Sequence, residues 1–389
     1  MDYFIGRASH IKPLDELLKL DTNSPLRIKL GIDPTASDVT LGWYAILRML
    51  RKFQELGHTA VLILGEFTAQ VGDPSGKSDT RSRIEYEEVS KYSKDVLSVI
   101  KNILHKDNLE IVSNNDWLSK LNTPDLLNLA SSTTLAQMME RDDFYSRYSK
   151  NSPISLLEFF YPLFQGYDSV AVKADIEIGG TDQLWNLMMG REIQKFYNIK
   201  PQVAMTFPLL IGTDGSKKMS QSFGNYISIN EPSDQIFGKL MSIPDEAMWD
   251  YYLLLTDLDI KAIDKLKLGV KNDSINPFEV KKELGLLILK ELFNEVEAEK
   301  ALNSFSNVTI NKNVPEELPT ILLPGERNIH LPKLFVDNGI SKSTSEARRL
   351  IKSGSVRVDS QIMDELDLKK KDLANKVLQV GKRRFFKII

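Results

Sequence analysis

The chain of 389 residues contains no cysteine and only four histidines. The lack of cysteine excludes disulfides, thiolate metal sites and cysteine nucleophiles. The histidines form no metal-ligand spacing, so no metal site is predicted. No apolar run approaches the roughly 18 residues that span a membrane, and the first residues do not resemble a signal peptide. We therefore expect a cytoplasmic protein that makes no contact with a membrane.

Composition is otherwise ordinary for a globular protein, with 42% hydrophobic and 26% charged residues, and the length allows two or three domains. The charge is unevenly distributed. Residues 331–389 hold 14 Lys and Arg against 7 Asp and Glu, whereas the rest of the chain is acidic. A basic C-terminus indicates contact with a nucleic acid. The alternative at this point is a solvated, lysine-rich surface.

The N-terminal part predicts a βαβ unit. Residues 26–30 alternate between apolar and polar types and predict a strand, and the apolar residues from Trp43 to Phe53 recur at helical spacing. Residues 60–65 form a short apolar run, which is typical of a buried parallel strand. In such sheets, ligands bind at strand ends and helix N-termini.

The remaining pattern is mixed. Helices are predicted from about 84 to 170 and from about 240 to 305, with further strands at 175–178 and 203–207. Residues 306–329 are rich in proline and asparagine and predict a linker. The last 60 residues predict a compact α/β piece.

Three segments carry candidate binding residues. Residues 73–77 form a turn that can present the carboxylate of Asp73. Tyr161, Gln165 and Asp168 have the spacing i, i+4, i+7, so a phenol, an amide and a carboxylate share one helix face. If that face is buried, the carboxylate needs a partner, which a substrate hydroxyl or ammonium can supply. In residues 179–183 two glycines allow close approach of a ligand, and the side chains of Asp182 and Gln183 can bind hydroxyls or a carboxylate.

Together these segments resemble the bacterial tyrosyl-tRNA synthetases, a class I aminoacyl-tRNA synthetase family. The resemblance covers essentially the whole chain and rests on residues 29–35, 65–77, 161–168, 179–183 and 218–226, in the family's order and spacing. It implies an α/β fold with a Rossmann-like catalytic domain at 1–238 that contains a helical insertion. It also implies an α-helical, anticodon-facing domain with a linker at 239–328 and a small C-terminal RNA-binding module at 329–389.

The resemblance also implies residue roles. Tyrosine would contact five side chains, Asp73, Tyr161, Gln165, Asp168 and Gln183, with Asp168 accepting a hydrogen bond from the phenol. The nucleotide would lie against Asp33, Gly42, Trp43, Gly180, Asp182 and Lys218. The catalytic positions would be Thr35, Thr40, Lys218 and Gln221. One branch of the family has a second tyrosine two residues before Gly31; Lys29 stands there in this chain, so phenol recognition would rest mostly on Asp168.

Two of the family's signatures are altered. In the first, His-X-Gly-His, both histidines are replaced, by Thr40 and Trp43. In the second, Lys-Met-Ser-Lys-Ser, the second lysine is replaced by Gln221, while Lys218, Lys217 and Lys77 remain as candidate phosphate partners. These positions stabilise the reacting phosphate in the family. Loss of one such donor commonly lowers a rate by about 10²–10³, although the replacements retain hydrogen-bond donors. Trp43 could either stack on adenine or fill its space.

Residues 329–389 resemble the small C-terminal αL RNA-binding module of these enzymes, and the likeness is carried by residues 340–343, 347–351 and 354–358. Its candidate RNA contacts are Lys342, Arg348, Arg349 and Lys352. The resemblance further implies a homodimer, tRNA(Tyr) and tyrosine as substrates, and ATP with Mg²⁺ as co-substrate.

Three hypotheses follow. The first, which the complete amino-acid set favours, is a working tyrosyl-tRNA synthetase with an unusual ATP site. The second is a paralog that binds tyrosine or tRNA without activating the amino acid, in a regulatory or specialised role. The third is an RNA-binding protein that uses mainly the C-terminal module, which would leave the amino-acid pocket without a purpose.

Overall fold

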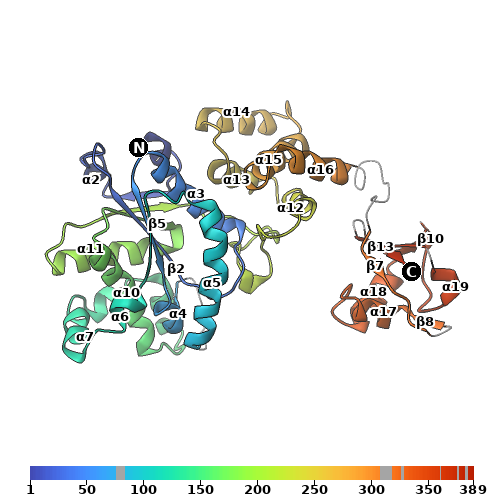
Figure 1. Ribbon diagram of the computed structural model, residues 1–389, viewed down its shortest axis with the longest axis horizontal. Coiled ribbons are helices and arrows are strands. Elements are labelled where there is room, and N and C mark those ends of the chain that lie inside the picture. The colour runs from blue at the N-terminus through green and yellow to red at the C-terminus, as the bar shows by residue number, and fades with distance from the viewer. Residues whose placement is uncertain (76–83, 307–317, 326–327, 360, 375, 382–383) are drawn as a thin grey trace. The chain divides into compact units, whose positions relative to one another are not determined.

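The structure is a computed structural model, and it describes residues 1–75, 84–306, 318–325, 328–359, 361–374, 376–381 and 384–389 (Figure 1). The chain forms two compact units, Met1–Leu292 and Phe293–Ile389. The division of the first 328 residues into a catalytic and a helical domain stays a prediction. No helix within the described ranges has the length and apolar character needed to cross a membrane.

A six-stranded sheet is the centre of the first unit. Its strands run in the order β1 (His10–Lys12), β6 (Val203–Phe207), β5 (Ile176–Gly180), β2 (Arg27–Ile32), β3 (Thr59–Leu64) and β4 (Leu109–Ser113). The strands from β6 to β4 are parallel, and β1 joins β6 antiparallel. This confirms the predicted βαβ unit and the strands near 175 and 203.

Two strands of this six-stranded sheet were not predicted. One of them is β4, which interrupts the helical stretch predicted for 84–170. Its apolar residues lie between charged and polar ones in a pattern that also fits a helix, so the sequence does not reveal the strand. All five of its residues are half-buried, as expected of a strand at the edge of the sheet. β1 has three residues, too few for a period to be recognised.

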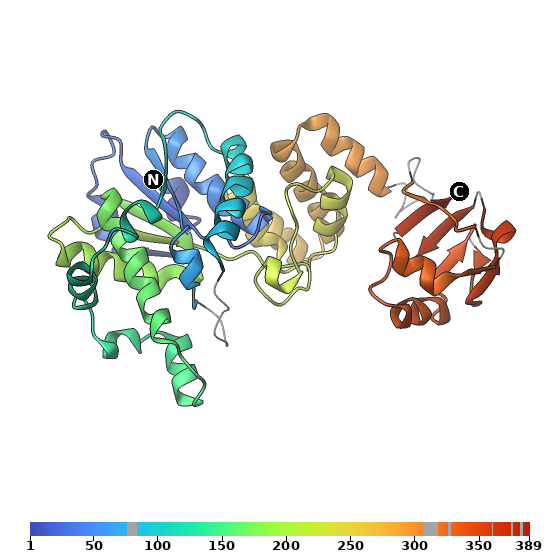
Figure 2. The same cartoon turned by 60° about the horizontal axis from the view of Figure 1, so that its bottom comes forward.

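Helices cover both faces of this sheet (Figures 1 and 2). α3 (Leu41–Glu55) and α5 (Tyr86–Ile103) lie on one side, and α10 (Leu156–Val172) and α11 (Leu184–Phe196) lie on the other. The shorter elements between them are α1 (Asp2–Ile5), α2 (Leu14–Leu18), α4 (Thr68–Val71), α6 (Asn115–Leu118), α7 (Thr123–Ala130), α8 (Leu135–Met138), α9 (Asp142–Ser149) and the 3₁₀ turns η1 (Thr181–Gln183) and η2 (Gln221–Phe223). Four helices complete the unit and confirm the predicted helical region: α12 (Ser233–Leu240), α13 (Met248–Leu255), α14 (Ile260–Lys271) and α15 (Pro277–Leu292).

The second unit begins with α16 (Glu295–Phe305) and contains a five-stranded sheet. The sheet order is β10 (Gln361–Ile362), β9 (Val356–Val358), β12 (Val377–Val380), β13 (Arg384–Ile388) and β7 (Thr320–Ile321). β8 (Asn328–His330) pairs with β11 (Asp367–Lys369), and the helices are α17 (Leu331–Asp337), α18 (Thr344–Lys352) and α19 (Lys370–Leu373). The predicted compact α/β piece is therefore present. β7 belongs to it, although the sequence places those residues in a linker; residues 307–317 of that linker lie outside the described ranges.

Candidate active site

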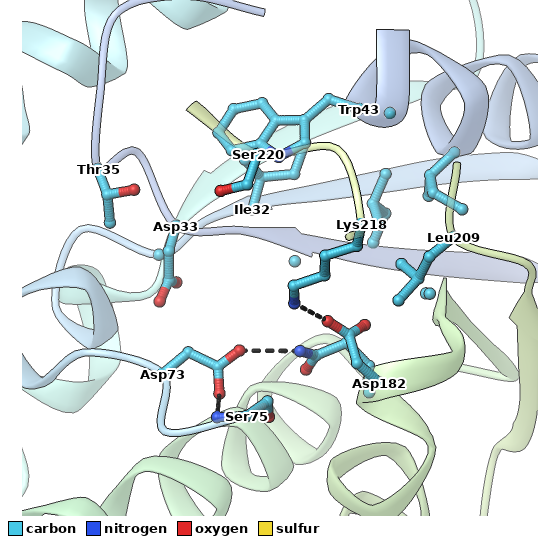
Figure 3. A pocket seen from close by; sticks show the side chains of 18 of the residues that line it. Ile32, Asp33, Thr35, Trp43, Asp73, Ser75, Asp182, Leu209, Lys218 and Ser220 are labelled. Carbon is cyan, nitrogen blue, oxygen red and sulfur yellow. Dashed lines mark hydrogen bonds and ion pairs between the residues drawn. The ribbon is translucent and has the colours of Figure 1, made fainter. Parts of the chain in front are cut away.

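A cavity of about 620 Å³ opens at the carboxyl ends of β2 and β5 (Figure 3). Its walls come from those strand ends, α10, the N-terminus of α3 and the segment from Pro208 to Phe223. All fourteen residues predicted for tyrosine, nucleotide and catalysis line it: Asp33, Thr35, Thr40, Gly42, Trp43, Asp73, Tyr161, Gln165, Asp168, Gly180, Asp182, Gln183, Lys218 and Gln221. Lys77 lies outside the described residues.

Asp168 lines the cavity from α10 and is 3% exposed. Its carboxylate accepts hydrogen bonds from the Trp117 indole at 2.8 Å and from the Asn114 amide at 3.2 Å. Burial raises the pKa of Asp168 to about 7, against the lowering effect of Lys29 and of the two donors. A buried carboxylate held in this way can accept a further hydrogen bond from a ligand hydroxyl.

Two more carboxylates line the same cavity. Asp73 accepts a hydrogen bond from the Gln183 side-chain amide at 2.8 Å and another from the backbone N–H of Ser75 (Figure 3). Asp33, which follows β2, accepts from the Tyr161 hydroxyl at 2.9 Å and from Thr68 at 2.7 Å. Burial raises the pKa of Asp33 to about 7 as well. The sequence prediction put Asp33 beside the nucleotide; its contact with Tyr161 joins it to the amino-acid side too.

The side-chain amide of Gln165 forms a hydrogen bond within the chain through its nitrogen. Its amide nitrogen donates to Glu177 at 3.2 Å. Its carbonyl oxygen Oε1 is buried and has no hydrogen-bond partner among the described residues. A buried acceptor without a partner is costly, so this oxygen is suited to a donor group of a ligand.

The polar groups predicted to face the nucleotide also have partners within the chain. The Thr40 hydroxyl caps α3 by accepting from the Trp43 backbone N–H at 3.3 Å. The Gln221 amide donates to the backbone carbonyl of Asp38 at 2.6 Å. Lys218 forms an ion pair with Asp182 at 2.5 Å (Figure 3).

The charge of the cavity is acidic. Five carboxylic acids line it, Asp33, Asp73, Asp168, Glu177 and Asp182. Lys218 is the single Lys or Arg among the described residues of the lining. Trp43, Ile32 and Ser220 line the same cavity (Figure 3). The described lining therefore favours a cationic group and supplies little positive charge to a polyphosphate.

Two glycines are required by this geometry. A Cβ at Gly65 would lie 2.0 Å from Asp33 Oδ1, and one at Gly180 would lie 2.5 Å from Leu209 Cδ2 and 2.9 Å from Asp182 Oδ1. Side chains at these positions would push the carboxylates out of place. At Gly180 these contacts are with side chains of the protein itself, so the predicted close approach of a ligand stays a prediction. The role of Gly65 was not predicted.

Sequence reasoning also missed Thr68, Asn114 and Trp117. Asn114 and Trp117 follow β4. The sequence pattern of residues 84–170 predicts a helix, so it does not indicate that these two residues follow the end of a strand. No cluster of three or more His, Cys, Asp or Glu residues in the described ranges is arranged to hold a metal ion.

The predicted RNA contacts lie in the second unit. In α18, Ala347 and Ile351 are buried, and Arg348, Arg349 and Lys352 are exposed, so the helix presents a basic face to solvent. Lys342, just before the helix, is exposed too.

Comparisons with known proteins agree with this geometry. Residues 21–309 match the family model of the class I tRNA synthetases (W and Y). The tyrosine–tRNA ligase of Haemophilus influenzae is 46% identical over 98% of this chain and 94% of its own length, and that of Carboxydothermus hydrogenoformans is 44% identical over 98% and 95%.

Solved structures show the same fold. A C-terminally truncated mitochondrial tyrosyl-tRNA synthetase from Coccidioides posadasii has a TM-score of 0.62 at 21% identity, covering 78% of this chain and 90% of that one. The synthetase from Archaeoglobus fulgidus complexed with L-tyrosine has a TM-score of 0.59 at 20% identity, covering 76% and 96%. The chain therefore belongs to the class I tRNA synthetases, and within them to the family of bacterial tyrosine–tRNA ligases.

Proposed function

We propose that this protein is a tyrosine–tRNA ligase, which activates tyrosine with ATP to tyrosyl-adenylate and transfers the tyrosyl group to tRNA(Tyr). The observation that carries the proposal is the amino-acid half of the cavity. It combines the buried carboxylate of Asp168 with further acceptors on Asp73, Tyr161 and Gln165. Tyrosine has the complementary groups, a phenol at one end and an ammonium at the other.

Each end of the amino acid has a defined partner. The phenol donates to Asp168, which Trp117 and Asn114 hold in position. The ammonium has three hydrogens, and Asp73, the Tyr161 oxygen and the Gln165 carbonyl oxygen can accept them. The amino acid then presents its carboxylate to the nucleotide side.

Activation requires positioning and charge stabilisation, because the tyrosine carboxylate is itself the nucleophile that attacks the α-phosphate and displaces pyrophosphate. Among the described residues that line the site, Lys218 is the available cation, and it must exchange Asp182 for a phosphate. Asp182 is then free to accept from the ribose hydroxyls. Mg²⁺ would arrive on the triphosphate, which supplies the oxygen ligands that Mg²⁺ prefers. The added positive charge suits an acidic cavity.

A second candidate function rests on the nucleotide side. Thr40, Gln221 and Lys218 are all engaged within the chain, and the histidines and the second lysine of the signatures are absent. These contacts favour a paralog that binds tyrosine or tRNA without ATP activation, in a regulatory or specialised role.

Tyrosine-dependent exchange of pyrophosphate into ATP separates the two. The measurement compares the native chain with the variant Thr40→His/Trp43→His/Gln221→Lys. Exchange by the native chain supports the ligase. If only the variant exchanges, the fold binds tyrosine but has lost activation, and the second candidate replaces the first.

The proposed function includes tRNA(Tyr) as partner and a homodimer as assembly. Helices α7 to α10 carry large exposed apolar side chains, Leu127, Leu135, Tyr145, Tyr148 and Leu156, each more than 60% exposed. In the proposed dimer, the second copy of the chain covers these side chains. We expect sedimentation to give a dimer, and Tyr148→Asp/Leu156→Asp to give a monomer; a monomeric native protein would refute this assembly. A cytoplasmic location stays a prediction.

A further inference from the structure

A buried polar cluster lies beside the amino-acid half of the cavity. Lys29 on β2 and Glu177 on β5 are direct partners in the sheet register, with side chains 0% and 1% exposed and an Nζ–Oε1 distance of 2.9 Å. Two residues of α10, Gln165 and Ser169, contact this pair, and Gln202 contacts it from the segment before β6.

Every hydrogen-bonding position of the ion pair is used. Lys29 donates to the backbone carbonyl of Gln165 at 2.8 Å, to the Ser169 hydroxyl at 2.7 Å and to Glu177. Glu177 Oε1 accepts from Lys29 and from the Gln165 amide; Oε2 accepts from Ser169 at 3.1 Å and from Gln202. A buried ion pair whose donors and acceptors all have hydrogen-bond partners has one stable arrangement.

This arrangement fixes the orientation of the Gln165 amide. An ionised carboxylate accepts hydrogen bonds and cannot donate them, so the amide nitrogen must face Glu177. The reverse orientation would put the carbonyl oxygen against a carboxylate oxygen. The oxygen Oε1 is thereby held on the other side of the amide group, in a residue that lines the cavity, and it is buried without a partner in the described chain.

We propose that Glu177 and Lys29 are positioning residues that hold the Gln165 carbonyl oxygen ready to accept a hydrogen bond from the ammonium of the amino acid. The proposal rests on the proposed binding of tyrosine and adds a selection rule. The positioned Gln165 oxygen increases the affinity for a phenolic ligand that carries a hydrogen-bond donor at the amine position. It does not increase the affinity for the same ligand without that donor.

The alternative is that the cluster only joins α10 to the sheet. Gly190 of α11 lies against it, since a Cβ there would be 2.8 Å from Gln202 Nε2 and 3.3 Å from Glu177 Oε2. A purely structural cluster would affect all ligands of the cavity to the same extent. A positioning role affects only ligands that carry the ammonium.

Two small probes make this distinction without ATP. Tyramine and 4-ethylphenol share the phenol and the two-carbon chain and differ by the ammonium. We would measure the Kd of both, and of L-tyrosine, for the native full chain and for Glu177→Gln. In this variant the new amide can donate as well as accept, so the Gln165 amide is free to turn.

The expected result is a loss of about tenfold in affinity for tyrosine and tyramine, the size of one hydrogen bond to a charged group. The affinity for 4-ethylphenol should change less than about twofold. Gln165→Leu should give the same pattern, and the double variant should lose no more than either single one, because both substitutions remove one interaction.

If Glu177→Gln does not fold, Lys29→Met/Glu177→Met serves instead, because apolar residues of similar volume often replace a buried ion pair without loss of stability. It leaves the Gln165 amide without an acceptor, and we expect the same selective loss. Equal losses for tyramine and 4-ethylphenol would overturn the inference while leaving tyrosine binding intact. Failure of the native chain to bind tyrosine would overturn both the inference and the proposed function.

Discussion

At the scale of single residues, the proposed function makes Asp168 the residue that selects the amino acid. Its carboxylate is buried, and its two hydrogen bonds from Trp117 and Asn114 leave acceptor capacity for a phenol. Sites that bind a substrate hydroxyl discriminate strongly against the analogue that lacks it, because the buried polar group is then left unpaired.

Asp168→Ala should therefore affect tyrosine far more than phenylalanine. We expect the affinity for tyrosine to fall by about 100-fold or more and that for phenylalanine to change less than about threefold. Equilibrium dialysis with both amino acids measures this. Comparable losses for the two would contradict the role of Asp168 in phenol recognition.

The pKa of Asp168 gives a second prediction. Its usual value is 3.8, and burial raises it to about 7 in the folded protein. Between these values the folded state holds a proton that the unfolded state has lost, so the free energy of unfolding falls as the pH rises from about 4 to about 7. The shift of about three units corresponds to at most about 4 kcal/mol.

Urea unfolding at a series of pH values measures this, with Asp168→Asn as the matched variant. Asparagine does not titrate, so the variant should gain stability relative to the native chain as the pH rises through this range. Asp33 has a raised pKa as well and is present in both proteins, but the charge of Asp168 is one cause of that rise, so the comparison measures the titration of Asp168 together with its effect on Asp33. Parallel stability curves would show that Asp168 keeps its ordinary pKa.

The sequence could predict that Tyr161, Gln165 and Asp168 share one face, because they lie on one helix at a spacing that sets this face, and all three line the cavity. Their roles in binding stay predictions. Their partners could not be predicted. The contacts of Asp168 with Trp117, of Lys218 with Asp182 and of Gln165 with Glu177 join different elements of the fold, and no local pattern encodes them.

Helix α3 is the element that carries the altered first signature, and its position depends on the helical region behind it. Arg48 on α3 is fully buried and bonds to Glu291 of α15 at 2.9 Å and to Asp257 at 2.6 Å. Glu291 also accepts from the Tyr44 hydroxyl at 3.1 Å and from Arg51. This network ties the helix that begins at Leu41 to α15.

Glu291→Ala should destabilise the protein by about 2–3 kcal/mol. Loss of one partner of a buried ion pair costs about 3–5 kcal/mol, and Asp257 remains to compensate part of the Arg48 charge. Glu192→Ala is the control, because Glu192 pairs with Lys195 at the surface of α11, and such a pair contributes at most about 1 kcal/mol. Urea unfolding compares the two variants, and equal effects would contradict the importance of the Arg48 network.

Helices and strands whose apolar residues recur at a regular spacing could be predicted from the sequence, and those without such a spacing could not. The helix from Leu41 and the strand from Thr59 follow from apolar spacing alone. The strand from Leu109 does not, because five half-buried residues with a charge among them fit a helix as well as a strand. Its misreading hid Asn114 and Trp117, so an error in one element removed two residues from the predicted site.

At the scale of the whole molecule, the uneven charge of the sequence corresponds to two units with different surfaces. The cavity of the first unit is acidic, and α18 of the second presents Arg348, Arg349 and Lys352 to solvent. Composition could predict that the C-terminus is basic. The arrangement of those charges required the structure, because the helical spacing of Ala347 and Ile351 determines which face of α18 is buried.

This arrangement predicts how the chain binds tRNA(Tyr). The variant Arg348→Ala/Arg349→Ala/Lys352→Ala should weaken tRNA binding by about tenfold or more at low salt. It should also reduce the slope of log K against log salt by about two to three, because each phosphate that the variant no longer neutralises lowers the slope by about one. The Kd for tyrosine should not change, because the cavity lies in the other unit.

The control changes the same charge elsewhere on the second unit. Lys369→Ala/Lys371→Ala/Lys387→Ala removes three exposed lysines outside α18. If α18 contacts the phosphates, this control should keep most of the affinity and of the salt slope. Equal losses for the two triple variants would mean that the second unit attracts tRNA through its net charge alone, and α18 would then have no particular part in recognition.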